Sequence, residues 1–474
     1  MKKLHFLSII FFFFGFTTSK GQFTVLHNFD SVQGEFPYGS LIASGNVLYG
    51  MASNGGATAS GCIFSINSNG SNFRDLYDFK GDSGGMHPGG SLLLSGNKFY
   101  GMTSAGGSHL SGCIFSVDTN GNNYKDIFNF YTVNGGDPDG SLIRIGGKLF
   151  GMTTSSARFQ NSNIFSIDTN GNNYKVLLDF GGTTTPQGNI PYGDLLFTGG
   201  KLYGMTSQGG VYNSGCIFTV DTNGTNYKDL HNFNDTNGAN PYGNLIVSGH
   251  KLYGMTLNGG LSDSADGIIF SIDINGSAFK VMFGFDLDPD HYKNGYGPEG
   301  SLTQISNKLY GMAAEGGIVG NGVIFSIDTS GNNFTNIHNF NDTNGSWPDG
   351  NLTLSGNNLF GMTSAGGQKN KGVIFSIDYT TVGINELNSS KEAVSIFPNP
   401  STGTFTFQLS AVSQKSLVEI YNMLGEKVYA ASLNSSKGGT STIVSLSDCG
   451  TGVYLYRITT TNGSLISTGK LIKE

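Results

Sequence analysis

Short apolar runs alternate with glycine- and asparagine-rich turns along most of this chain. In one stretch the apolar runs are residues 90–95, 98–104, 113–117 and 124–130, which read GSLLLS, KFYGMTS, CIFSV and YKDIFNF. Short runs of this kind are typical of β-strands. Asn120-Gly121 separates the last two runs, and Asn-Gly is a hairpin signal because a type I′ turn needs positive φ at both central residues. The stretch therefore predicts four short antiparallel strands.

This pattern recurs seven times, each copy marked by an aromatic residue, a glycine and a methionine. The glycines of the motif are Gly50, Gly101, Gly151, Gly204, Gly254, Gly311 and Gly361. Successive copies lie 51, 50, 53, 50, 57 and 50 residues apart. Alternation within Leu-Tyr-Gly-Met places Leu and Gly on one face and Tyr and Met on the other, so neither face is polar. Four strands buried on both faces predict one propeller blade per copy.

The two ends of the repeat region complement each other. Residues 23–30 (FTVLHNFD) match the fourth run of other copies, such as residues 230–235 (LHNFND), whereas the seventh copy stops after its third run at residues 373–378. Pairing the spare first strand with the incomplete last sheet would close a ring and remove its exposed edges. We therefore predict an all-β fold with a seven-bladed β-propeller over residues 22–380.

Composition narrows the class of protein. The 474 residues include 73 glycines, about twice the usual share, and only 12% are charged, about half the usual share. This composition disfavours helical repeats. The net charge is −7 and the repeats contain no basic cluster, which argues against nucleic acid as a partner.

The first residues have the pattern of a secretory signal. Lys2 and Lys3 precede an apolar core at residues 6–16, and small residues stand before a cleavage point ahead of Gln22. The core is too short to span a bilayer, and no later stretch approaches ~20 apolar residues. We expect residues 1–21 to be a signal peptide, with no transmembrane segment in the mature chain.

Three of the four cysteines occupy one repeat position. Cys62, Cys113 and Cys216 each begin the third strand of a copy, where other copies have Ile or Val. Equivalent positions in different blades lie too far apart to be bridged. We expect them to be small buried apolar residues.

A different pattern begins after the repeats. Residues 381–393 form a polar linker, and residues 394–474 contain alternating runs at short spacing that predict a small Ig-like β-sandwich. This last segment resembles the type A C-terminal sorting domain of the type IX secretion system of Bacteroidetes. The residues that carry the resemblance are Phe397, Pro398, Asn399, Pro400, Gly403, Gly425, Gly452, Tyr454, Gly469 and Lys470.

One departure from the sorting-domain pattern is residues 448–451, Asp-Cys-Gly-Thr, where relatives have Leu-Pro. The resemblance implies the type IX secretion machinery as a partner, export across the outer membrane, and release or attachment at the cell surface. The repeats are similar to the GloVer-type tandem repeats of secreted bacterial proteins, on G-x-LYGMT-x-x-GG, G-x-IFSID and LHNF. That family implies no established activity.

Candidate binding residues fall in the longer loops, which share one face of a propeller and vary most between copies. These ligand-face candidates are His87, Tyr192, Tyr242, Tyr292, Tyr296 and Trp347, with Tyr38 beside them. Flat aromatic side chains could stack on sugars or on a peptide. The alternative is that they only seal the top of the disc.

Acidic residues on the same face are the candidates for catalysis. The repeats contain three glutamates, Glu35, Glu299 and Glu315, while Asp139, Asp194 and Asp349 lie near Pro-x-Gly turns. Paired carboxylates can cleave glycosides, but carboxylates spread over a ring need not converge. Asp286, Asp288 and Asp290 resemble the start of a calcium loop, although His291 and Gly297 replace the glycine and glutamate that such a loop needs.

We therefore expect a secreted or surface-displayed binding module for an extracellular glycan or protein, without enzymatic activity or cofactor. The alternatives are a polysaccharide hydrolase or lyase that uses Glu299 and Glu315, or a structural surface component. Glutamates that converge on the central pocket would favour the enzyme, an aromatic shelf without them would favour binding, and a flat, filled top would favour the structural role.

Overall fold

A computed structural model describes residues 23–380, except 83, 132, 155–161, 182–186, 261–265 and 286–292, and residues 394–474, except 410–415, 423–425, 434–439 and 461–464. The expected signal peptide and linker, the calcium candidates Asp286, Asp288 and Asp290, and Tyr292 and Gly425 lie outside the described residues. The chain divides into two compact units, residues 1–381 and 382–474. The described residues contain no α-helix, and so no helix among them could cross a bilayer.

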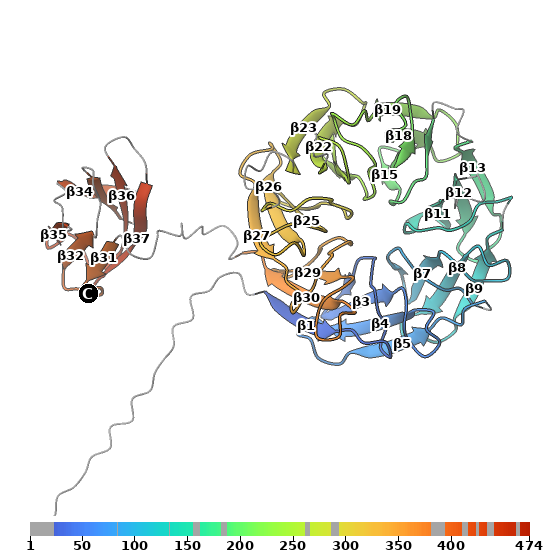
Figure 1. Ribbon diagram of the computed structural model, residues 1–474, viewed down its shortest axis with the longest axis horizontal. Helices are drawn as coiled ribbons and strands as arrows, with labels where there is room; N and C mark the ends of the chain where they lie inside the picture. The colour runs from blue at the N-terminus through green and yellow to red at the C-terminus, as the bar shows by residue number, and fades with distance from the viewer. Residues whose placement is uncertain are drawn as a thin grey trace, which may run out of the picture. The chain divides into compact units, whose positions relative to one another are not determined.

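The first unit contains seven four-stranded antiparallel sheets among its described residues, numbered here from 1 to 7 in chain order (Figure 1). Sheet 1 is β2 (Ile42–Ser44), β3 (Val47–Ala52), β4 (Cys62–Asn67) and β5 (Arg74–Asp78). Sheet 2 is β6 (Leu93–Ser95), β7 (Lys98–Thr103), β8 (Cys113–Asp118) and β9 (Lys125–Asn129). Sheet 3 is β10 (Ile143–Ile145), β11 (Lys148–Thr153), β12 (Asn163–Asp168) and β13 (Lys175–Asp179).

Sheet 4 is β15 (Leu196–Thr198), β16 (Lys201–Thr206), β18 (Cys216–Asp221) and β19 (Lys228–Asn232), with a small ladder of β14 (Gly188–Asn189) and β17 (Gln208–Gly209) beside it. Sheet 5 is β20 (Ile246–Ser248), β21 (Lys251–Thr256), β22 (Ile268–Asp273) and β23 (Lys280–Gly284). Sheet 6 is β24 (Thr303–Ile305), β25 (Lys308–Ala313), β26 (Val323–Asp328) and β27 (Thr335–Asn339). Sheet 7 is β28 (Thr353–Ser355), β29 (Asn358–Thr363), β30 (Val373–Asp378) and β1 (Thr24–Asn28).

The Leu-Tyr-Gly-Met motif forms the second strand of each sheet and is buried on both faces, as the sequence predicts. In β21, Leu252 is fully buried and Tyr253 and Met255 are 4% and 1% exposed. Gly254 pairs with Phe270 of β22, and a Cβ on this glycine would lie 2.6 Å from Phe270 Cζ. The glycine is therefore needed so that the phenylalanine ring can cross the strand closely.

The ring of sheets is closed by its ends. β1 pairs with β30, with Thr24 opposite Ser376 and Asn28 opposite Val373. Figure 1 shows β1, in blue, beside β30, in orange, with the seven sheets arranged around a central axis. The predicted pairing of the first strand with the last sheet is confirmed.

The turns after the third strands are hairpins, but of a different type from the one expected. Asp221 N–H donates to Thr225 O and Gly224 N–H donates to Asp221 O, each at 2.9 Å, which encloses a three-residue loop. Gly224 has a φ of 90°, whereas Asn223 is not among the residues with positive φ. The expectation of a type I′ turn is therefore wrong here, and the glycine supplies the left-handed position of a longer loop.

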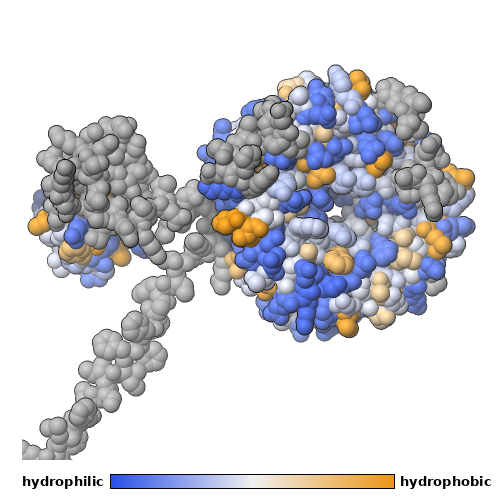
Figure 2. Space-filling model, in the orientation of Figure 1, coloured by the Kyte–Doolittle hydropathy of each residue, from blue (hydrophilic) through white to orange (hydrophobic). Residues whose placement is uncertain are grey.

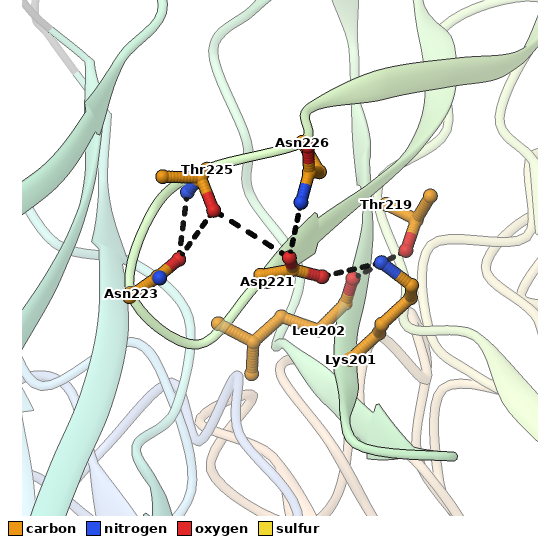
Figure 3. Close-up of polar contacts among 7 residues, drawn as sticks. All are labelled: Lys201, Leu202, Thr219, Asp221, Asn223, Thr225 and Asn226. Carbon is orange, nitrogen blue, oxygen red and sulfur yellow. Dashed lines mark hydrogen bonds and ion pairs between the residues drawn. The ribbon is translucent and has the colours of Figure 1, made fainter.

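The carboxylate of Asp221 holds this hairpin together. Figure 3 shows Asp221 accepting from the ammonium group of Lys201, from Asn226 Nδ2 at 2.6 Å and from Thr225 Oγ1 at 3.5 Å. Equivalent Lys–Asp pairs occur in sheets 2, 3, 5 and 6. Cys62, Cys113 and Cys216 are fully buried and unbridged, as predicted.

The second unit has two sheets that share one core. The first sheet contains β31 (Val394–Phe397), β32 (Thr404–Leu409) and β35 (Thr440–Ser445). The second contains β34 (Lys427–Leu433), β33 (Ser416–Tyr421), β36 (Gly452–Thr460) and β37 (Leu465–Lys473), in that spatial order. Phe405 and Phe407 from one sheet pack with Val418, Ile420 and Ile458 from the other, and all five are fully buried.

Candidate functional site

Seven loops lead into the innermost strands of sheets 1 to 7, and all seven carry the same short pattern. It consists of a proline, a variable residue, a glycine, a small polar residue and a leucine. The pattern occupies residues 37–41, 88–92, 138–142, 191–195, 241–245, 298–302 and 348–352. Because each copy precedes the strand nearest the central axis, the seven copies meet around that axis.

The glycines of the pattern form a closed ring in which each backbone rests on the next. A Cβ on any of them would overlap the carbonyl group of the glycine in the following sheet, and the last glycine meets the first. The seven are Gly39, Gly90, Gly140, Gly193, Gly243, Gly300 and Gly350. No larger residue fits at these positions without moving the neighbouring sheet.

A ring of hydrogen bonds follows directly after the glycines. Each small polar residue donates its N–H to the side-chain oxygen of its counterpart in the next sheet, over distances of 2.5–2.8 Å. Asn351 donates to Ser40 Oγ and so completes the circle. The members of this polar ring are Ser40, Ser91, Ser141, Asp194, Asn244, Ser301 and Asn351. The backbone at the seven glycines and at the seven polar-ring residues is therefore held in place at the centre without a ligand.

The polar ring and the innermost strands line a central cavity of about 350 Å³. Asp194 is its only charged lining residue. The carboxylate accepts from Ser141 N–H at 2.5 Å and from Asn244 Nδ2 at 2.7 Å, while burial raises its pKa. Figure 2 shows the ring hollowed at its centre and bordered there mainly by hydrophilic and intermediate residues.

The variable residues between proline and glycine directly precede the glycine ring, next to the residues that line the cavity, and we call them the mouth residues. They are Tyr38, Gly89, Asp139, Tyr192, Tyr242, Glu299 and Asp349. Tyr192 and Tyr242 stack with ring centroids 4.3 Å apart and planes 13° apart. Tyr38 is 46% exposed. The mouth thus combines aromatic surface with carboxylates.

The charges of the mouth residues act on one another across several sheets. Burial and then the charge of Glu299 raise the pKa of Asp349 to about 8. Burial raises the pKa of Asp139 to about 6. Burial also raises the pKa of Tyr38, and the charges of Asp349 and Glu299 add to the shift. Side chains from sheets 1, 6 and 7 therefore share one electrostatic environment.

A further ring of residues, which we call the outer ring, stands one residue before each proline. Its members are Phe36, His87, Asp137, Ile190, Asn240, Gly297 and Trp347, and their φ values lie between 48° and 62°. A left-handed backbone is costly for residues other than glycine, and it persists where surrounding contacts fix it. Trp347 donates its N–H to Asn321 O of the preceding sheet and accepts from Ser364 N–H of its own sheet.

The structure separates the candidates that the sequence grouped together. Tyr192, Tyr242 and Glu299 are mouth residues, whereas His87 and Trp347 belong to the outer ring, where Trp347 is 55% exposed.

The other two glutamates do not stand at the position between proline and glycine, so they are not mouth residues. Glu315 is exposed and accepts from the hydroxyl of Tyr296 at 2.7 Å, although its charge contributes to the raised pKa of Glu299. Glu35 forms an ion pair with Lys371 at 2.5 Å.

The glycine ring, the polar ring and the outer ring were not predicted from the sequence. Asp139 and Asp349 were expected only as acids near turns, and Gly89 was not noticed. The signal was the Pro-x-Gly pattern, which becomes informative once the seven copies are placed in a circle. Among the described residues there is no group of three or more His, Cys, Asp or Glu side chains that could hold a metal ion.

The sorting motif has a structural explanation in the second unit. Asn399 Nδ2 donates to Lys470 O and Asn399 Oδ1 accepts from Ile472 N–H, both at 2.8 Å. The buried ammonium group of Lys473 donates to the carbonyls of Leu446, Ser447 and Cys449. The beginning and the end of this unit are therefore tied together by the motif.

Comparison with known families supports both predicted resemblances. The Gloeobacter/Verrucomicrobia repeat model matches residues 12–196, 164–293 and 191–406. The model of the secretion system C-terminal sorting domain matches residues 395–474. Both resemblances are thereby confirmed, and the tail indicates secretion through the type IX system. No curated protein matches the sequence.

Several solved structures are similar at low identity. TolB from Acinetobacter baumannii is 14% identical with a TM-score of 0.37, over 59% of this chain and 60% of TolB, so the chain spans about three fifths of that neighbour. An oligogalacturonate lyase in complex with manganese is 11% identical, with a TM-score of 0.48 over 76% of this chain and 93% of the lyase. PorZ, a surface component of the type IX secretion system of Porphyromonas gingivalis, is 11% identical, with a TM-score of 0.22 over 92% of this chain and 75% of PorZ.

Proposed function

This chain belongs to the Gloeobacter/Verrucomicrobia repeat family, and on that premise we propose that it is a secreted or cell-surface binding module for an extracellular glycan or protein. The repeat unit acts as a seven-bladed β-propeller that presents its mouth residues to the ligand. The Ig-like tail directs the chain to the type IX secretion machinery, and the binding itself involves no catalysis or cofactor.

One observation carries this proposal: the mouth is preorganised and open. The glycine ring and the polar ring fix the backbone on which all seven mouth residues stand. The stacked pair Tyr192 and Tyr242 offers aromatic surface beside the carboxylates of Asp139 and Glu299. Sugars present apolar faces for stacking and hydroxyl groups for carboxylates, and a fixed site loses little entropy on binding. If this face of the ring had only a structural role, we would expect it to be flat and filled, without a central cavity.

The test is a glycan-array screen of the mature full-length chain, repeated with Tyr192→Ala/Tyr242→Ala. We expect hits that weaken at least about tenfold in this variant, because each lost stacking contact removes on the order of 1 kcal/mol. Tyr212→Ala is the matched control, since Tyr212 is a 59% exposed tyrosine of a loop on the same face but is not a mouth residue. Hits that the double substitution leaves unchanged would contradict binding at the mouth.

A hydrolase remains the second candidate because of one pair of residues. With a pKa of about 8, Asp349 keeps its proton at neutral pH, next to the carboxyl group of Glu299. Two carboxyl groups with separate protonation states can act as acid and base in glycoside hydrolysis. Asp349 would protonate the glycosidic oxygen while Glu299 takes a proton from the attacking water. Release of reducing ends that is lost in Asp349→Asn would support this candidate over a binding module.

A further inference from the structure

The mouth is a ring of seven positions with side chains on only six of them. The exception is Gly89 of the loop into sheet 2, between Tyr38 of sheet 1 and Asp139 of sheet 3. Its φ lies outside the left-handed region, so the backbone does not require glycine there. Three other sheets hold a tyrosine at the equivalent position, so the fold also accepts a large side chain. The mouth therefore lacks a side chain at one of its seven positions.

The side of this gap is formed by a carboxylate. A Cβ on Gly89 would lie 3.5 Å from Asp139 Oδ1, an ordinary contact, and 3.3 Å from Asp139 O, a contact that a shift of a few tenths of an ångström relieves. Along the same loop, His87 of the outer ring precedes Gly89 by two residues, and its Nδ1 is 3.2 Å from Ser53 O. A chain that leaves the mouth at this point passes a carboxylate and an imidazole.

The charge of the whole site has one sign. The mouth residues, the polar ring and the outer ring contain five carboxyl groups, from Asp137, Asp139, Asp194, Glu299 and Asp349, and neither lysine nor arginine. Asp349 keeps its proton at neutral pH, so the negative charge comes from the ionised groups among the other four. Lys371 lies 4.9 Å from the centre of the Phe36 ring of the outer ring, but it is paired with Glu35. Such a site repels uronate or sulfate groups and favours a ligand with ammonium groups.

The size of the cavity limits how much ligand it can hold. Its volume of about 350 Å³ is at the lower end of small-molecule sites, which span about 300–1,000 Å³. A long polymer segment cannot lie inside, but the end of a chain can. Tyr192 and Tyr242 stack on each other at the mouth positions of sheets 4 and 5, two and three sheets along the ring from the gap in sheet 2.

Building on the proposed function, we propose that the mouth binds the end of an amino-sugar oligosaccharide whose remaining chain leaves the ring over sheet 2 through the gap at Gly89. The aromatic pair stacks on the terminal sugar, and the carboxylates bind its ammonium and hydroxyl groups. The gap sets the direction of the chain, because every other side of the mouth is occupied by a side chain.

The experiment is calorimetric titration of the mature full-length chain with four probes. These are the β-1,4-linked tetramer of glucosamine, glucosamine itself, cellotetraose as the neutral tetramer, and tetragalacturonate as the anionic one. We expect the glucosamine tetramer to bind at least about tenfold more tightly than cellotetraose, which corresponds to one favourable ion pair, and tetragalacturonate to bind more weakly than both.

The decisive variant is Gly89→Tyr, which closes the gap with a residue that the fold already accepts at this position. We expect it to weaken the glucosamine tetramer at least about tenfold and to leave glucosamine within about twofold. Gly147→Tyr is the matched control, because Gly147 lies in the turn between β10 and β11 with no atom within 4 Å of an added Cβ. Equal melting temperatures of the three proteins verify folding.

The outcomes distinguish a failure of this inference from a failure of the proposed function. Unchanged tetramer affinity in Gly89→Tyr, or tighter binding of tetragalacturonate than of the glucosamine tetramer, would overturn the present inference and leave a glycan-binding mouth intact. A wild-type chain that binds none of these sugars and none on the array would overturn the proposed function itself.

Discussion

Phe23 stacks face to face on His338, with ring centroids 3.8 Å apart and planes 4° apart. The same stack joins neighbouring sheets elsewhere in the ring, for example between Phe73 and His27. In those sheets the aromatic residue comes from the hairpin that follows the third strand, but sheet 7 lacks that hairpin. Phe23, at the start of the described chain, supplies it instead. Closure of the ring therefore repeats an internal contact rather than adding a special one.

Phe23→Ala should destabilise the repeat unit by about 2 kcal/mol. The substitution removes a half-buried aromatic side chain together with its stacking contact, and it loosens β1 at the point of closure. Equilibrium unfolding in urea measures the change. Tyr212→Ala, which removes a ring that is 59% exposed, should change the free energy of unfolding by less than about 0.5 kcal/mol. Equal effects of the two substitutions would show that β1 contributes nothing to closure.

The stability of the repeat unit should fall as the pH drops from about 6.5 to about 4. Burial lowers the pKa of His27 and of His338 to about 4, and it also lowers the pKa of His231. Between the two values the unfolded chain binds protons that the folded chain does not, so protonation favours unfolding in this window.

The matched variant for this prediction replaces all three histidines by phenylalanine. Phe128 and Phe283 already occupy the same repeat position and make the same stacks on Tyr174 and Phe334. The variant should fold and should lose less stability than the wild type between pH 6.5 and 4. Thermal melts across this range measure the difference between the two proteins, which cancels the titration of carboxylates common to both. If the two proteins lose the same stability between pH 6.5 and 4, the prediction that the three histidines are buried and neutral in the folded chain is wrong.

Gly254→Ala should destabilise the repeat unit by about 1–3 kcal/mol, because the new methyl group would lie 2.6 Å from Phe270 Cζ and overpack the sheet. Gly147→Ala is the control, since its methyl group would meet no atom within 4 Å and its φ is not left-handed. Thermal unfolding of both variants should separate them clearly. Similar melting temperatures would mean that the Leu-Tyr-Gly-Met glycine is not required by packing.

The period of the apolar pattern was enough to predict the sheets and their closure. The constraint is local, because Gly254 and Phe270 are paired in adjacent strands of one copy, and every copy repeats it. The hydrogen bond from Asn351 N–H to Ser40 Oγ joins residues 311 positions apart and exists only because the ring closes. The mouth depends on such distant contacts.

The variable positions explain why the mouth was harder to predict. Tyr38, Gly89 and Asp349 occupy one repeat position with no shared chemistry, so no motif marks them. The proline and glycine on either side are the only constant signal. Trp347, one of the ligand-face candidates, stands in the outer ring, one residue before the proline.

Asn399→Ala and Lys473→Met should each unfold the sorting domain at lower temperature and impair delivery to the cell surface. Asn399 makes two hydrogen bonds to β37, and the Lys473 ammonium group makes three to the loop at residues 446–449. Losing the amide should cost about 1–3 kcal/mol, and losing the buried ammonium group should leave three carbonyls without their donor. Calorimetry of the full-length chain measures the transition of the second unit, and surface labelling of cells measures export.

Lys470→Met separates folding from recognition, because Lys470 is exposed and contacts Asn399 only through its backbone carbonyl. This variant should keep the melting temperature of the second unit. If its export nevertheless fails while its stability is unchanged, the Lys470 side chain is read by the secretion machinery directly. If export is normal, the part of the motif that matters is the part that holds β37 in place. If Lys470→Met lowers the melting temperature of the second unit as much as Lys473→Met does, the motif does not divide into a buried support and an exposed signal.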